Sequence, residues 1–201
     1  CPVKVTYAFS VSEFSGDMNF INNIDAYNRY IKHVEDKKEQ AIANSEEHQS
    51  HYIYTLTVDL DRVGVWEKED GSNEEVLSKE EKAKRVLDLL DIVMTLSRQI
   101  RGRWENLSPV FVAGGVFSSK HPFFMEGVEA QEENGKLRLN VTRLRGCAEL
   151  VPEQDKVVVG VLPGTFVNES ELRGAFSIKT IKEAFEELKR QVREYYGVPQ
   201  V

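Results

Sequence analysis

The chain has 201 residues, of which 41% are hydrophobic and 29% are charged, as in an ordinary globular protein. Its formal net charge of -7 argues mildly against a nonspecific nucleic-acid binder, although one local basic face would be compatible with it. No apolar run approaches the roughly 20 residues needed to span a bilayer, and no secretory signal opens the chain. Cys1 and Cys147 form neither a metal-binding spacing nor a disulfide framework, so we expect a reducing, cytoplasmic environment.

Two strands are predicted in the N-terminal third. In "VKVTYAFSVSEF", apolar and polar residues alternate, which predicts a half-buried strand with five side chains on one face: Val3, Val5, Tyr7, Phe9 and Val11. Residues 35–51 are polar and predict a mobile loop or hairpin tip. "HYIYTLTVDLDRVG" predicts a second strand that ends at Gly64. An acidic connector follows over residues 67–82, with a turn at "DGSN".

Helix signals flank the second half of the chain. Ser78 and Glu81 predict a capping box for a helix that ends near Gly102, with an apolar stripe of Val86, Leu89, Leu90, Val93, Met94 and Leu96. Ser177 is a possible cap of the last helix, which Gly197 and Pro199 would end. Its predicted stripe is Ile181, Ala184, Phe185, Leu188, Val192 and Tyr195.

Strand signals lie between these helices. "PVFVAGGVF" predicts a buried strand, and "KVVVGVLPG" a strand buried on both faces. Asn134-Gly135 is a hairpin signal between "MEGVEAQ" and "KLRLNVTRL". The order indicates one α+β domain, with helices on one face of a mostly antiparallel sheet.

Metal and catalytic signals are weak. His48 and His51 lie in a polar segment without rigid further ligands, so solvated histidines are the simpler interpretation. Asp59 and Asp61 would share a strand face, but no matching base or nucleophile is visible. "AGGVFSS" lacks the lysine of a phosphate cradle, and its glycines indicate a bulge or a close backbone approach. We therefore expect no cofactor, no metal and no catalytic residue.

Basic residues support nucleic-acid binding more strongly. Residues 98–145 contain eight Lys/Arg and five Asp/Glu, a local excess of +3. Arg138 is expected to share a strand face with Asn140 and Thr142. "INNIDAYNRYIK" combines amides, tyrosines and cations, which suit bases and phosphates, but composition alone equally allows a loop with tyrosines packed inward.

The order of the segments resembles one known family. "PVKVTYAFSVSEF" is followed by "AYNRY" and then by "YIYTLTVDLDRVG", which ends in a turn similar to Leu-Asp-Leu-Asp-x-x-Gly. An Arg-rich helix and "SPVFVAGGVFSSKHPFF" come next. This order resembles the DevR-type family in its archaeal form, the repeated backbone subunit of the type I CRISPR Cascade complex. The resemblance covers most of residues 1–145 and contains no catalytic motif.

The resemblance implies a fold and a domain layout. The fold would be an RRM-like (ferredoxin-like) antiparallel sheet with helices on one face and a thumb-like insertion. Residues 1–51 would be a thumb-like strand and polar loop, and residues 52–201 the sheet and helices of a single core. The family normally has a strand and a helical insertion before this point, so we expect the chain to be a piece of a longer protein that lacks the N-terminal part of the core.

The resemblance also implies a non-catalytic role. Several copies would stack along the guide RNA (crRNA), with other Cascade subunits and target DNA as further partners and no membrane contact. Candidate RNA-binding residues are Asn22, Asn23, Asn28, Arg29, Tyr30, Lys32, Arg98, Arg101, Arg103, Lys120, Arg138 and Arg143. One alternative is a metal-dependent nuclease using Asp59, Asp61 and a histidine such as His51. The other is a protein-binding assembly subunit or a regulator of the DevR type.

Overall fold

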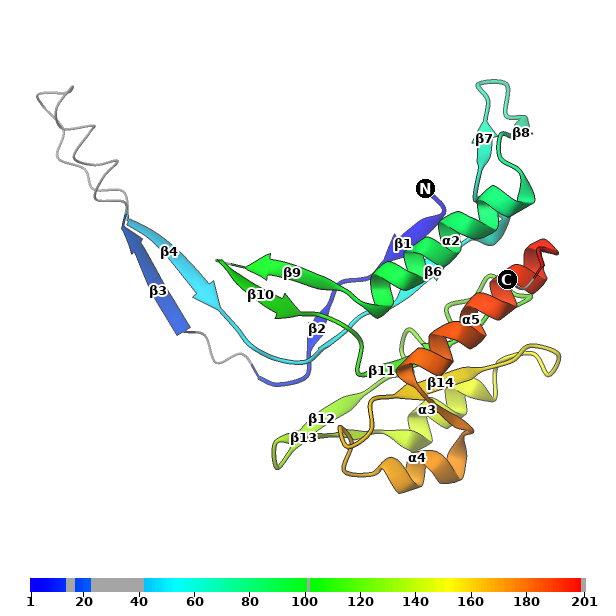
Figure 1. The fold of residues 1–201 in the computed structure, drawn as a ribbon. Helices are drawn as coiled ribbons and strands as arrows, with labels where there is room; N and C mark the ends of the chain where they lie inside the picture. The colour runs from blue at the N-terminus through cyan, green and yellow to red at the C-terminus, as the bar shows by residue number, and fades with distance from the viewer. Residues whose placement is uncertain (14–16, 23–41, 101, 200–201) are drawn as a thin grey trace, which may run out of the picture. The chain divides into compact units, whose positions relative to one another are not determined.

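The computed structural model describes residues 1–13, 17–22, 42–100 and 102–199. The chain forms two compact units, of which one is Ser10–Tyr52 and the other combines Cys1–Phe9 with Ile53–Val201. In the smaller unit, strand β3 (Asp17–Asn22) pairs antiparallel with β4 (Ile42–Glu47) (Figure 1). The interpretation of residues 35–51 as a mobile loop or hairpin tip is therefore wrong for residues 42–47, which pair with β3 as a strand without needing an apolar pattern. Residues 35–41 lie outside the described residues.

The predicted N-terminal strand is broken into two short ones. β1 (Val3–Val5) pairs antiparallel with β6 (Leu56–Val58), and β2 (Phe9–Ser10) pairs with β5 (Tyr52–Ile53). The predicted half-buried face is wrong at Val5, Tyr7 and Phe9, whose exposed fractions are 62%, 86% and 67%. Alternation predicted the strand pairing, but no element of the described chain covers this face.

The "DLDRVG" segment leaves β6 through a short 3-10 helix, Leu60–Arg62, and a left-handed Gly64. β7 (Val65–Glu67) and β8 (Asn73–Glu75) then form an antiparallel hairpin. Gly71 in the "DGSN" turn has a φ of 80°, which confirms the predicted turn. The acidic connector is thus a structured hairpin over most of its length.

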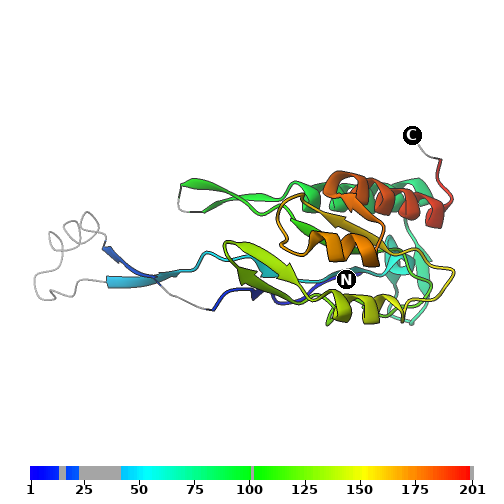
Figure 2. The ribbon, with the colours of Figure 1, turned by 90° about the horizontal axis from the view of Figure 1, so that it is seen from below.

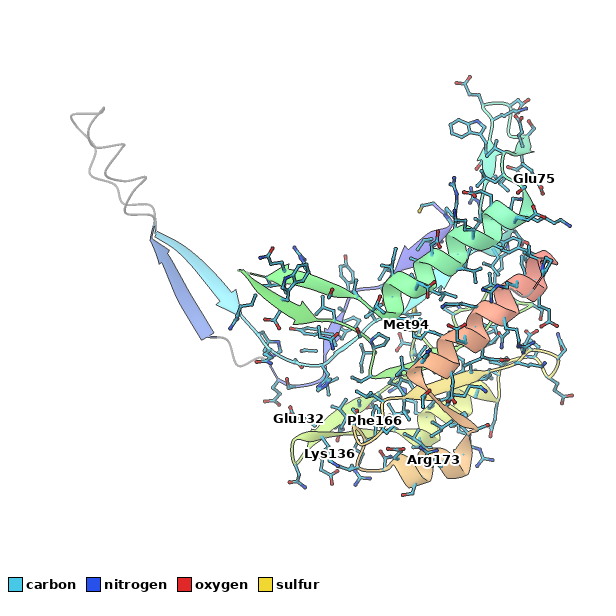
Figure 3. The ribbon with its side chains drawn as sticks, viewed as in Figure 1. Glu75, Met94, Glu132, Lys136, Phe166 and Arg173 are labelled. Carbon is cyan, nitrogen blue, oxygen red and sulfur yellow. The ribbon has the colours of Figure 1, made fainter. Side chains whose placement is uncertain are left out.

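Helix α2 (Lys79–Met94) begins where the sequence predicts and ends earlier. The Ser78 hydroxyl accepts a hydrogen bond from the Glu81 N–H at 3.3 Å, which confirms the cap. The predicted end near Gly102 is wrong, because the helix stops at Met94 (labelled in Figure 3) and Thr95 turns back onto the Asp91 carbonyl. The remaining residues form an antiparallel hairpin of β9 (Ser97–Ile100) and β10 (Arg103–Asn106).

The core of the larger unit is a three-stranded sheet covered by one helix. β14 (Val158–Val161) lies between β11 (Phe111–Gly114), which is antiparallel to it, and β15 (Ile178–Thr180), which is parallel. All four residues of β14 are buried, as predicted. Helix α5 (Ile181–Tyr196) packs on the three strands, and α2 packs against α5 (Figure 1). The parallel pair makes this sheet mixed and not fully antiparallel.

Helix α5 corrects two sequence predictions. Its cap is Thr180, which forms a complete capping box with Glu183, and not Ser177. The apolar stripe ends in buried Tyr196, whereas Tyr195 is 45% exposed. Gly197 ends the helix in the left-handed conformation, as predicted. Packing against β14 and α2 decides which of the two tyrosines faces the core, and sequence periodicity alone does not.

The predicted Asn134-Gly135 hairpin is confirmed. β12 (Ala130–Glu133) pairs with β13 (Lys136–Leu139), and both turn residues have positive φ, 52° and 73°. The expectation that Arg138, Asn140 and Thr142 share a strand face is wrong. Asn140 instead caps helix α3 (Val141–Ala148) by accepting a hydrogen bond from the Arg143 N–H at 3.0 Å. Helix α4 (Glu169–Ala175) packs against α3.

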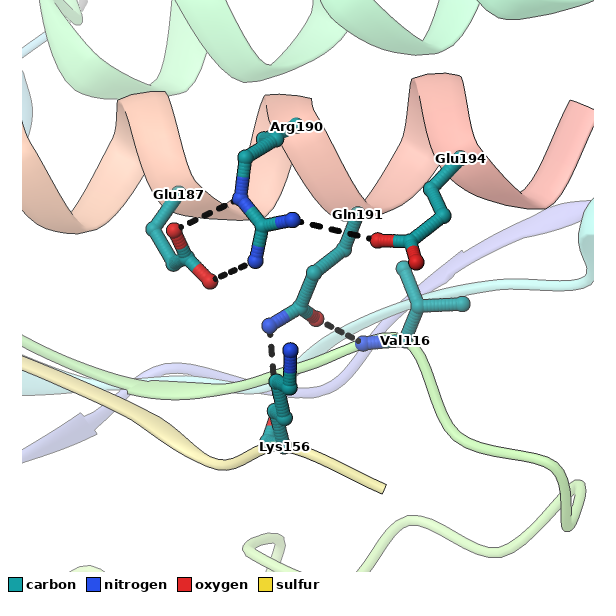
Figure 4. Close-up of polar contacts among 6 residues, drawn as sticks. All are labelled: Val116, Lys156, Glu187, Arg190, Gln191 and Glu194. Atoms are coloured by element: carbon teal, nitrogen blue, oxygen red, sulfur yellow. Dashed lines mark hydrogen bonds and ion pairs between the residues drawn. The ribbon is translucent and has the colours of Figure 1, made fainter. Parts of the chain in front are cut away.

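A buried glutamine connects α5 to the segments that follow β11 and precede β14 (Figure 4). Gln191 Oε1 accepts a hydrogen bond from the Val116 N–H at 2.8 Å, and its Nε2 donates to the Lys156 carbonyl at 3.3 Å. A Cβ on the neighbouring Gly115 would lie 2.5 Å from the same Lys156 oxygen. The close backbone approach predicted for "AGGV" is therefore confirmed at Gly115.

The described residues form a mixed α+β fold with four α-helices and small, mostly antiparallel sheets. Figure 2 shows α5 and the sheet of the larger unit from below. Among the described residues, no helix combines the length and apolar character needed to cross a membrane.

Candidate nucleic-acid interface

Half of the predicted RNA-binding residues lie outside the described residues: Asn23, Asn28, Arg29, Tyr30, Lys32 and Arg101. Asn22 is the last residue of β3, opposite Ile42 of β4. RNA contacts by this set remain a prediction. The other five predicted residues, Arg98, Arg103, Lys120, Arg138 and Arg143, all belong to the larger unit.

Lys120 is held by two carboxylates. Its Nζ lies 2.8 Å from Asp59 Oδ1 and 2.8 Å from Asp61 Oδ2. The hydrogen bond from Lys120, and to a smaller extent the one from Tyr195, lowers the pKa of Asp61. Hydrogen bonds to Asp59 and Asp61 raise the pKa of Lys120. The cation is therefore charge-compensated within the unit, which weakens the case for a phosphate contact by this side chain.

The same cluster gives Asp59 and Asp61 a structural role. The Tyr195 hydroxyl donates to Asp61 Oδ1, and the Tyr196 hydroxyl donates to the Leu60 carbonyl at 2.7 Å. These bonds connect the turn after β6 to the last turn of α5. Over the described ranges, no group of three or more His, Cys, Asp or Glu is placed to hold a metal ion.

Arg138 and Arg143 are also paired with carboxylates. Arg138 makes a two-point contact with Glu133, at 2.5 and 3.2 Å, across the β12–β13 hairpin. Arg143 lies 3.3 Å from Glu129, and hydrogen bonds from Asn140 and then Arg143 lower the pKa of that carboxyl. Both arginines thus balance the acidic strand β12 and its flank.

A shallow hollow of about 270 Å³ lies beside these arginines, between β12–β13, α3 and α4. Its lining carries both signs of charge, because Glu129 and Glu171 face it together with Arg138. The Asn168 Nδ2 donates hydrogen bonds to the Leu139 carbonyl and to Glu171 Oε2, so the Asn168 amide already has structural partners. The hollow therefore has no excess of cations for a phosphate.

The β9–β10 hairpin differs from these clusters. Arg98 has no carboxylate within ion-pair distance among the described residues, although Glu105 lies opposite it in the ladder. Within the described ranges, the carboxylate contact of Arg103 is a long one to Glu105, 3.8 Å. Trp104 beside it is 74% exposed. Sequence reasoning missed this tryptophan, although "RGRWE" already places it directly beside the arginines.

The family model of the CRISPR-associated negative auto-regulator DevR/Csa2 matches residues 1–135. The chain belongs to this family. The resemblance inferred from the order of the motifs is therefore confirmed. No curated protein matches the chain. No solved structure matches it either.

The DevR/Csa2 match places most of the candidate residues inside the family region. It includes strands β1 to β12, the β9–β10 hairpin and Lys120, but ends before Arg138 and Arg143. Arg98 and Arg103 are the described candidate arginines inside the matched region. The two arginines beyond residue 135 are the ones that carboxylates already hold.

Proposed function

We propose that this DevR/Csa2 family chain is a non-catalytic guide-RNA (crRNA) binding backbone subunit of a Cascade-type CRISPR complex. Several copies would stack along the RNA on an RRM-like core, with other Cascade subunits as neighbours and target DNA as the final partner. The observation that carries the proposal is the family match over residues 1–135. The weakly paired arginines Arg98 and Arg103 give it a physical basis.

The chemistry required is electrostatic and does not depend on base sequence. Arginines contact phosphates and release counterions, so affinity falls as salt rises. Exposed aromatic side chains add stacking, which tolerates any base. A subunit that holds the backbone of a guide leaves base edges free for pairing. The overall charge of -7 then limits binding to local basic elements.

The first test is the extraction and sizing of nucleic acid from the purified protein. Discrete short RNA is the expected result. A purely protein-binding subunit or regulator would instead form homo-oligomers that retain no RNA at low salt, and that result would contradict the proposal.

The second test measures salt dependence. Each lost phosphate contact reduces the slope of log affinity against log salt by about 0.7 for a single strand, so Arg98→Ala with Arg103→Ala should reduce it by about 1.4. Arg85→Ala is a matched control, because this arginine on α2 is held by Glu81 at 3.0 Å. Equal slopes for the double variant and the parent would show that Arg98 and Arg103 contact no phosphate.

The non-catalytic role has its own test. Incubation of RNA with the protein and magnesium or manganese should give no cleavage, since Asp59 and Asp61 already share Lys120. Metal-dependent cleavage that Asp59→Asn abolishes would establish the nuclease alternative instead.

A further inference from the structure

The β9–β10 hairpin is a two-stranded ribbon with two chemically different faces. Directly opposed residues of an antiparallel pair share a face. Trp104 opposes Gln99 and shares its face with two small polar residues, Ser97 and Asn106. Arg98, Ile100, Arg103 and Glu105 make up the other face. An aromatic face and a cationic face therefore lie on either side of one thin ribbon.

Trp104 has no packing role in the described chain. Its exposed fraction of 74% is higher than that of Trp66, 64%, and no ring contact of Trp104 occurs among the described residues. All residues of β9 and β10 are exposed except Glu105, which is half-buried. Water thus reaches the indole, and its ring is accessible for stacking on a ligand.

The second tryptophan provides an internal comparison. Trp66 lies on the β7–β8 hairpin, where residues 65–75 hold five Asp/Glu and one Lys. Residues 97–106 around Trp104 hold three Arg and one Glu. The two exposed indoles therefore lie in local charges of opposite sign, -4 and +2. Only the second environment attracts a polyanion.

We propose that Trp104 stacks on a base of single-stranded RNA that crosses the β9–β10 ribbon, while Arg98 and Arg103 on the opposite face hold its phosphates. A single strand carries alternating π-faces and phosphates, so a strand that passes round the edge of the ribbon can present a base to one face and phosphates to the other. The proposal rests on the proposed RNA-binding function and adds the element and the side chain that take a base. It concerns a different hairpin from the predicted thumb-like insertion.

The experiment uses the two tryptophans as separate reporters. Trp66→Phe leaves Trp104 as the only indole, and Trp104→Phe leaves Trp66. Each full-length protein is titrated with an oligouridylate, while filter retention reports binding independently of emission. The emission of Trp104 should be quenched on saturation and that of Trp66 should not. Heparin, a polyanion without bases, should bind without the same quenching.

Affinity gives a second readout. Trp104→Ala should weaken oligouridylate binding about 5-fold or more, as expected for the loss of one stacked base. Trp66→Ala should stay within about 2-fold of the parent because its hairpin is acidic. Binding without any change in Trp104 emission, or equal affinities of Trp104→Ala and the parent, would overturn the stacking proposal and leave the RNA-binding function intact. No retention of RNA by the parent would overturn both.

Discussion

Replacing Gln191 by methionine should destabilise the larger unit by about 1.5–4 kcal/mol. Methionine keeps the length and approximate volume of glutamine, so the change opens no large cavity. It removes the hydrogen bonds by which the amide connects α5 to Val116 and Lys156 (Figure 4). The perturbation thus isolates the polar connection from the packing of the helix.

The magnitude follows from the two partners. The Val116 N–H loses a 2.8 Å bond in a partly buried position, and an unsatisfied donor there costs about 1–3 kcal/mol. The bond to the Lys156 carbonyl is longer, 3.3 Å, and contributes about 0.5–1 kcal/mol. Their sum corresponds to a decrease of about 1–2 M in the urea midpoint, given a typical slope of about 2 kcal/mol per M.

The assay is urea unfolding followed by far-ultraviolet circular dichroism. Gln154→Met is the matched control, because Gln154 is exposed and its Nε2 donates a hydrogen bond to the Ser118 hydroxyl at 3.1 Å. This control should stay within about 0.5 kcal/mol of the parent. A Gln191→Met protein as stable as the control would refute the reasoning, since the amide would then not hold these segments together.

Further predictions concern the sheet under α5, helix α4 and the tyrosine at the end of α5. A Cβ on Gly160 of β14 would lie 2.5 Å from the Ala184 Cβ, so Gly160→Ala should destabilise by about 1–3 kcal/mol in urea unfolding. Gly174→Ala in α4 has nothing within 4 Å and should instead stabilise by about 0.5–1 kcal/mol; equal effects would contradict the close approach. Burial raises the pKa of Tyr196 to about 12 from 10.0. The contribution of protonated Tyr196 to the stability of the fold is full below pH 10 and is lost as pH rises through about 12. The melting temperature of Tyr196→Phe should therefore fall less steeply than that of the parent over this pH range. The same fall in both proteins would refute this prediction.

Local chemistry made some elements predictable. Asn134-Gly135 required positive φ at both positions, and two residues of this type between strand patterns determine a hairpin without help from distant residues. Ser78 determined the start of α2 in the same way, through a bond to an N–H three residues away. The buried strand β14 followed from its continuous apolar run.

Other elements depended on partners far along the chain. The end of α2 at Met94 could not be predicted from periodicity, because apolar residues continue to Leu96 and then to Ile100 in the β9–β10 hairpin. Asn140 resembled a strand residue until its side chain was seen to cap α3. The half-buried face predicted for β1 and β2 failed because alternation predicts pairing but does not supply a covering layer.

The sequence by itself determined the family, the hairpin turns, the cap of α2 and the list of basic candidates, since each depends on residue identity over short spans. Only the tertiary structure decided which of those cations are compensated. Lys120 meets Asp59 from 61 residues away, and Arg143 meets Glu129 across the start of α3, whereas Arg98 meets no carboxylate within the described part of the chain. A cation's availability depends on charges within a few ångströms in space, and chain order does not fix that distance.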